Sequence, residues 1–144
     1  MHCPVTGINI PRFLAAAIAG FVFIFGFEFL VHGNLLNDMY DQTGSLWRAK
    51  EDTIIPWMMG TQFLTAFIVA YIYALGCKGM EDKSPKCCKC GVGFGLKIGA
   101  LIAVLGAAPY AWMPIPMALA LSWAAAGLVK GLGLGVISSL LYKK

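Results

Sequence analysis

The segment PMALALSWAAAGLVKGLGLGVISSLLY, residues 116–142, decides the fold of this chain. It is long and apolar enough to cross a bilayer, which takes about 20 helical residues. Gly127, Gly131 and Gly135 recur every four residues, so they form one stripe along a helix. Lys130 lies about midway and is the only charged residue of the segment. A glycine stripe permits close packing against another backbone, and a cation in hydrocarbon needs a polar partner. Both features predict that this segment packs against other transmembrane helices.

The rest of the chain has a matching composition. Of its 144 residues, 59% are hydrophobic and only 12% are charged. A chain this short has too little interior to bury so much apolar surface away from water. We therefore predict an all-α membrane protein, a single integral membrane domain over residues 1–144, whose partner is the lipid bilayer. Four transmembrane helices are predicted at about 11–32, 54–76, 91–112 and 116–142.

The net charge of +4 does not indicate a nucleic-acid partner, because the basic residues border the apolar segments. We also expect no cleavable signal peptide. Residues 1–11 contain no Lys or Arg, and the apolar run over residues 13–31 is too long for a signal-peptide core.

The first predicted helix carries Glu28 and His32 near its end, four residues apart and hence on one face. Two interpretations remain open: the two side chains reach water at the helix end, or they form a polar site at the mouth of the bundle. Residues 33–53 are more polar and lead to the second helix. Their alternation of apolar and polar residues predicts a polar interfacial element between helices 1 and 2. In the second helix, Gln62 lies at a depth comparable to that of Glu28 and is a candidate hydrogen-bond partner for it; the alternative is a bond from Gln62 to a nearby backbone carbonyl.

Glycines at four-residue spacing also open the third predicted helix. Two such stripes on consecutive helices, joined by a short link rich in proline, predict a tight antiparallel hairpin. The stripes mark helix contacts within one chain or between copies, as in a homo-oligomer or a larger membrane complex. The helix-packing residues are Gly91, Gly95, Gly99, Gly127, Gly131 and Gly135.

The distribution of Lys and Arg predicts the orientation of the chain. Four spans place the N-terminus, the 77–90 connection and the C-terminus on one side of the membrane. That side holds most of the basic residues, whereas the other holds only Arg48 and Lys50, so both termini are expected in the cytoplasm. Trp47, Trp57 and Trp112 are expected to form a belt on the outer side.

A cysteine cluster lies on the predicted cytoplasmic side, where thiols stay reduced. Cys77, Cys87, Cys88 and Cys90 could offer thiolates to a soft metal ion, copper or zinc. Their spacing matches no standard zinc pattern, so a run of ordinary cysteines is the competing interpretation. In a eukaryotic host, palmitoylation would be a third one. No other cofactor is predicted.

One stretch resembles a known group of proteins. It comprises Glu28-Phe-Leu-Val-His32-Gly33, then Leu35-Leu36, Tyr40 and Leu46-Trp47-Arg48. In this first half, the chain resembles an uncharacterised family of small bacterial four-helix inner-membrane proteins. The resemblance implies a bacterial inner (plasma) membrane and supplies no activity. The cysteine cluster is not part of the pattern.

Lys130 and Glu28 are expected to be partners. At about 1.5 Å per residue, Lys130 lies roughly 18 Å from the cytoplasmic end of its helix, and Glu28 roughly 24 Å from the cytoplasmic start of the first helix. Two long side chains can span that difference. The hypothesis is that Glu28 and Lys130 form an ion pair. His32 and Gln62 join this pair to complete an intramembrane polar cluster. The alternatives are that Lys130 extends alone to the cytoplasmic surface, or that it is uncharged because it is buried.

Three classes of function fit these features. The first, which the sequence favours over the other two, is an accessory, assembly or packing protein that associates through its glycine-lined helices. The second is a small transporter or channel with a polar path at Glu28, His32, Gln62 and Lys130. The third is soft-metal handling by the cysteine cluster. An enzyme is not expected, because the sequence contains no catalytic triad pattern, histidine-rich metal motif or phosphate-binding loop.

Overall fold

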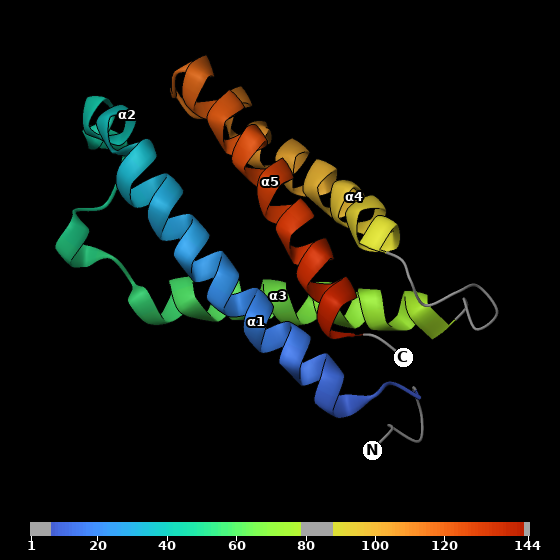
Figure 1. The fold of residues 1–144 in the computed structure, drawn as a ribbon. Helices are drawn as coiled ribbons and strands as arrows, with labels where there is room; N and C mark the ends of the chain where they lie inside the picture. Colours follow the sequence, from blue (N-terminus) through green and yellow to red (C-terminus); the bar gives the residue numbers. More distant parts are fainter. Residues whose placement is uncertain (1–6, 79–87, 143–144) are drawn as a thin grey trace.

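The computed structural model describes residues 7–78 and 88–142, and in these ranges it contains helices and no strand (Figure 1). The long helices are α1 (Ile10–Leu30), α3 (Ile55–Lys78), α4 (Cys88–Ala107) and α5 (Met117–Leu141). A π-helical turn, η1 (Val31–Leu35), continues α1 and leads to the short helix α2 (Asn37–Gln42). Three single 3₁₀ turns complete the list: η2 (Gly44–Leu46), η3 (Lys50–Asp52) and η4 (Ala108–Ala111).

The four long helices are each long and apolar enough to cross a membrane. This confirms the predicted all-α class with four transmembrane helices. Asn9 caps α1 by accepting a hydrogen bond from the backbone N–H of Arg12, and Pro11 occupies the first turn, where its missing N–H has no cost. The backbone N–H of Asn9 donates to the Tyr142 hydroxyl, 3.1 Å away. The start of α1 and the end of α5 are therefore neighbours at one end of the bundle, the terminal end (Figure 1).

Helices α4 and α5 run side by side as an antiparallel hairpin and make the most extensive contact in the fold (Figure 1). Their glycines lie at this contact, with the backbones touching. A Cβ atom added to Gly131 would lie 2.2 Å from the backbone of Gly99, and one added to Gly135 would lie 2.3 Å from the carbonyl oxygen of Gly91. Gly95 and Gly127 are also restricted, because an added Cβ atom would lie 2.7 and 2.9 Å from the facing backbone. The six glycines of the two stripes are thus used within a single chain.

Helix α1 packs against α3 and, less extensively, against α5. Its contact with α3 is made by small residues toward the terminal end: Ala16, Ala17, Ala70 and Ala74 are buried there around the Phe13 ring. The first half of α3 diverges from the other helices, and Trp57, Phe63 and Leu64 on it are exposed. Figure 1 shows α3 crossing behind α1 instead of running parallel to it. This divergence leaves space between α1, α3 and α5.

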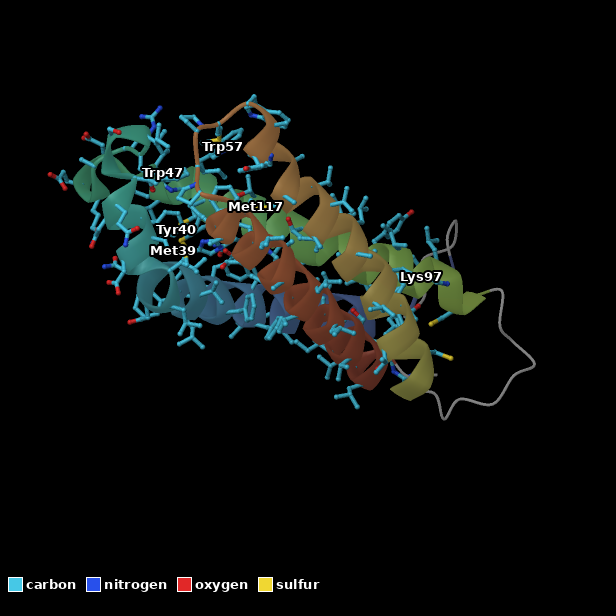
Figure 2. The ribbon with its side chains drawn as sticks, turned by 90° about the horizontal axis from the view of Figure 1, so that it is seen from above. Met39, Tyr40, Trp47, Trp57, Lys97 and Met117 are labelled. Atoms are coloured by element: carbon cyan, nitrogen blue, oxygen red, sulfur yellow. The ribbon has the colours of Figure 1, made fainter. Side chains whose placement is uncertain are left out.

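The other end of the bundle, the α2 end, is closed by an aromatic layer. Tyr40 and Trp47 pack edge to face at 5.3 Å, and Trp123 of α5 lies 6.0 Å from Trp47. Buried aliphatic residues of η1 and α5 support them, among them Val31 and Leu119. Figure 2 shows Tyr40 and Trp47 close to Met117, the first residue of α5, with Lys97 far away toward the terminal end. Trp47 therefore belongs to this layer, whereas the other two tryptophans expected in a belt, Trp57 and Trp112, are exposed.

Three predicted helix ends need correction. The first helix does not stop at His32, because the π-turn carries it to Leu35, and the backbone N–H of Leu36 bonds the carbonyl of Val31. α3 continues two residues beyond Gly76, and α4 starts at Cys88 instead of Gly91. A helix of 24 residues, such as α3, is about 36 Å long and extends beyond a hydrocarbon core of about 30 Å, so its terminal turns reach the interface.

Candidate intramembrane polar site

Glu28 of α1 and Lys130 of α5 are in contact in the interior of the bundle. The Lys130 Nζ atom donates to Glu28 Oε1 over 2.5 Å, and the two side chains are only 21% and 19% exposed. The contact joins two helices that are far apart in the chain. Because an isolated charge in a membrane is costly, each residue supplies the opposite charge that the other needs. The structure thus brings together the pair that the sequence analysis proposed.

His32 lies one helical turn beyond Glu28, and its Nε2 atom is 2.9 Å from Glu28 Oε2. Its other ring nitrogen, Nδ1, is 2.5 Å from the Tyr40 hydroxyl. The indole N–H of Trp123 donates to the same hydroxyl over 2.7 Å. A continuous hydrogen-bonded chain therefore runs from Lys130 through Glu28, His32 and Tyr40 to Trp123, from the bundle interior to the aromatic layer.

The Glu28 carboxylate fixes the direction of this chain at His32, because it can only accept, so Nε2 carries a proton and donates to it. Burial, opposed by the Trp123 hydrogen bond and assisted by the Glu28 charge, raises the pKa of Tyr40, which therefore keeps its hydroxyl proton. In the neutral form of the His32 ring, Nδ1 accepts from the Tyr40 hydroxyl, and the oxygen of that hydroxyl accepts from Trp123. Each donor from Tyr40 inward points toward Glu28.

An open pocket of about 300 Å³, called the cavity below, lies beside the ion pair, in the space that the divergence of α3 creates. Glu28 and Lys130 form its charged wall. The opposite wall is polar and belongs to the first half of α3. The lining residues are Ile24 and Glu28 from α1, Met58, Thr61, Gln62 and Thr65 from α3, and Lys130 from α5. Met58 is in the first turn of α3, so the cavity extends toward the α2 end of the bundle.

Gln62 lines the cavity, but the predicted hydrogen bond to Glu28 does not form. Its Oε1 atom is buried and has no hydrogen-bond partner in the described part of the chain. The reason is the divergence of α3, which places Gln62 across the cavity from Glu28. The Thr61 and Thr65 hydroxyls donate to backbone carbonyls one turn earlier, at 2.9 and 2.8 Å, so their oxygens remain available only as acceptors. An unsatisfied buried amide oxygen costs about 1–3 kcal/mol, and a bound molecule could satisfy it.

An apolar layer closes the bundle between the cavity and the terminal end. Ile24, Ala66 and Leu134 each lie four residues from a cavity residue, on the same helix face and toward the termini. All three are at most 2% exposed and belong to one cluster with Val69. Gly20 permits their close approach, since an added Cβ atom there would lie 3.2 Å from Leu134. The polar features therefore do not continue across the whole bundle.

Sequence reasoning missed Tyr40 and Trp123 as members of the site. A signal existed for Trp123, which lies seven residues before Lys130 and hence on the same face of α5. None existed for Tyr40, because its position depends on the π-turn after His32. π-Turns within helices are often found at functional sites.

The cysteine prediction is only partly within the described residues. Cys77 lies in the last turn of α3 and Cys90 in the first turn of α4, both partly buried. Cys87 and the side chain of Cys88 lie outside the described residues. Over residues 7–78 and 88–142, no three metal-binding side chains come together. Binding of copper or zinc stays a prediction.

The fold and the site define a class: the chain is a multi-pass membrane protein of four helices that spans a lipid bilayer and holds a charged pair beside an intramembrane cavity. A scan against protein-family models and searches of curated proteins and of solved structures find no match. The resemblance to small bacterial inner-membrane proteins therefore stays an expectation, and function must be argued from the site.

Replacing Tyr40 by phenylalanine should interrupt the hydrogen-bonded chain at its centre. The Tyr40→Phe variant leaves the indole N–H of Trp123 and Nδ1 of His32 without their partner. We expect a loss of about 1–3 kcal/mol in the free energy of unfolding, measured by denaturant titration in detergent micelles. In the Tyr40→Phe background, Trp123→Phe should lower the free energy of unfolding by less than it does in the wild type. The hydroxyl that the indole N–H bonds is already absent there. Tyr110→Phe, at an exposed position of η4, is the control and should change little. Equal effects at Tyr40 and Tyr110 would contradict the network.

Proposed function

We propose that this protein is a small proton-linked carrier that binds a small polar molecule in the cavity between α1, α3 and α5. The observation that carries the proposal is the hydrogen-bonded chain of titratable groups from Tyr40 through His32 to Glu28, which ends at the wall of that cavity. Ionisable groups inside a membrane are costly, and they commonly mark substrate and proton pathways. A volume of about 300 Å³ is within the range of small-ligand pockets.

The geometry favours a carrier over a channel and over a packing protein. A channel needs a polar path across the bundle, and the Ile24, Ala66 and Leu134 layer interrupts it. A packing protein would use its glycine stripes to bind partners, and here both stripes contact each other within one chain. Assembly with other copies would therefore use other surfaces.

The proposal includes an orientation and a location. The Lys and Arg distribution supports cytoplasmic termini, which would make the cavity accessible from the outer side through the α2 end. The resemblance described above supports a bacterial inner membrane.

The test is a thermal unfolding screen of the purified protein in detergent with four classes of solute. These are anions (nitrate and pyruvate), a cation (tetramethylammonium), a zwitterion (glycine) and a neutral amide (urea). A ligand at 100 times its Kd stabilises a protein by about 2.7 kcal/mol, so we expect at least one class to raise Tm by about 5 °C.

Two variants locate the binding. Gln62→Leu removes the amide from the cavity wall and should abolish the Tm shift. Gln42→Leu, at the exposed end of α2, makes the same chemical change away from the cavity and should retain it. A screen in which no class raises Tm, or in which both variants keep the shift, would contradict the proposed function.

A further inference from the structure

We infer that the ligand of the cavity is a small monovalent anion, and that it enters together with one proton, which Glu28 receives. The inference rests on the proposed carrier function and adds to it the substrate class and the stoichiometry. It follows from the hydrogen-bonding capacity of Lys130, the charge balance of the cavity and the place where the proton chain ends.

Hydrogen-bonding capacity remains beside the ion pair. Lys130 has three N–H donors, and Glu28 uses one of them. Each oxygen of Glu28 already accepts one hydrogen bond, Oε1 from Lys130 and Oε2 from His32. The two unused N–H donors of the Lys130 ammonium attract an anion.

Charge balance at the ion pair accounts for the proton. With Lys130 positive and Glu28 negative, the cavity has no net charge, and a net charge at this depth is costly. An anion bound to Lys130 beside an ionised Glu28 would leave one negative charge in excess. Protonation of Glu28 removes that excess, so one anion and one proton enter together and the cavity stays neutral.

The order of groups along the chain favours an anion over a cation. A cation bound to Glu28 would require Lys130 to lose its proton, and Glu28 is the only polar partner of Lys130 among the interactions described. A proton that comes from Tyr40 and His32 reaches Glu28 before Lys130, so proton exchange has a direct route to the carboxylate. Within the described residues, the groups around the pair are His32 on the same helix, Tyr40 of α2 beyond it, and the uncharged Thr61, Gln62 and Thr65 of α3.

The proton step can be written with its atoms balanced. Nδ1 of His32 is bonded to the Tyr40 hydroxyl, so a hydronium ion from the aqueous side gives its proton to the Tyr40 oxygen as the Tyr40 O–H bond breaks and that proton forms an N–H bond on Nδ1. The Nε2–H bond then breaks, and its proton forms an O–H bond on Glu28 Oε2. His32 is again neutral, and its new Nδ1–H donates to Tyr40, whose oxygen has two lone pairs and also accepts from Trp123. Glu28 is now neutral, and Lys130 binds the incoming anion.

The protonated carboxyl keeps both of its partners. The O–H on Glu28 Oε2 donates to Nε2 of His32, which gave up its proton in the transfer, and Oε1 still accepts from Lys130. The two other N–H donors of Lys130 are free to bind the anion.

The experiment uses the full chain in liposomes that contain a pH-sensitive dye. Nitrate, pyruvate or methanesulfonate is added outside, and potassium with valinomycin holds the membrane potential at zero. We expect the interior to acidify by one proton per anion taken up, at the same rate with and without valinomycin, because the coupled step carries no net charge. Activity with nitrate alone indicates an inorganic ligand, and activity with pyruvate alone indicates a carboxylate.

Variants and outcomes complete the test. Glu28→Gln should lower the anion-driven acidification at least tenfold, whereas Glu51→Gln, exposed in η3, should keep the wild-type rate. The inference is overturned by proton movement driven by tetramethylammonium, by anion uptake that carries current, or by an absence of acidification with all three anions. If the thermal screen nevertheless finds a ligand of another class, the carrier proposal stands and the anion inference alone fails. If the screen finds none, both fail.

Discussion

Glu28→Lys and Lys130→Glu should each lower the free energy of unfolding by about 3–5 kcal/mol, the range for breaking a buried ion pair. Each change leaves two like charges side by side at positions that are about one-fifth exposed. The double variant should recover most of the loss, since the pair is restored with its direction reversed. His32 can adapt, because its Nε2 atom can accept from the ammonium introduced in place of the Glu28 carboxylate while Nδ1 donates to Tyr40.

The measurement is a denaturant titration in detergent micelles of the wild type, both single variants and the double variant. Glu51→Lys is the matched control for the first change, since it makes the same substitution at an exposed position, and it should have little effect. A double variant that has lost as much stability as the two single variants together would show that the residues do not interact.

Gly131→Ala should have an effect of similar size through packing alone. The added Cβ atom would lie 2.2 Å from both the N and Cα atoms of Gly99, and no side-chain rotation can relieve a clash with backbone. Helices α4 and α5 must then move apart. Most of the contact that holds the hairpin together is lost. We expect a loss of about 3 kcal/mol or more, at the upper end of the range for overpacked interiors.

Gly93→Ala is the control for this prediction. Gly93 lies in α4 between two glycines of the stripe, but a Cβ atom there meets nothing within 4 Å. Alanine also favours helix, by up to about 1 kcal/mol relative to glycine. The stability should therefore be unchanged or slightly raised. If the two variants have the same stability, the glycine stripe does not determine the helix contact.

The sequence by itself determined the features that depend on position along a helix. The length of the apolar segments was sufficient to predict four spans. A run of about 20 apolar residues matches the thickness of a bilayer and is uncommon in other kinds of structure. The four-residue glycine spacing predicted the α4–α5 contact, since it places every member of a stripe on one face. Counting the rise per residue placed Glu28 and Lys130 at similar depth. The structure brings these two residues together.

Only the tertiary structure decided the features that depend on how helices turn and cross. The π-turn at Val31–Leu35 brings Tyr40 back to His32 and Trp123, and no periodic pattern in the sequence encodes that reversal. The divergence of α3 separates Gln62 from Glu28 and opens a cavity where a hydrogen bond was expected. Residue spacing fixes depth and face within one helix, but the distance between helices follows from the packing of all of them together.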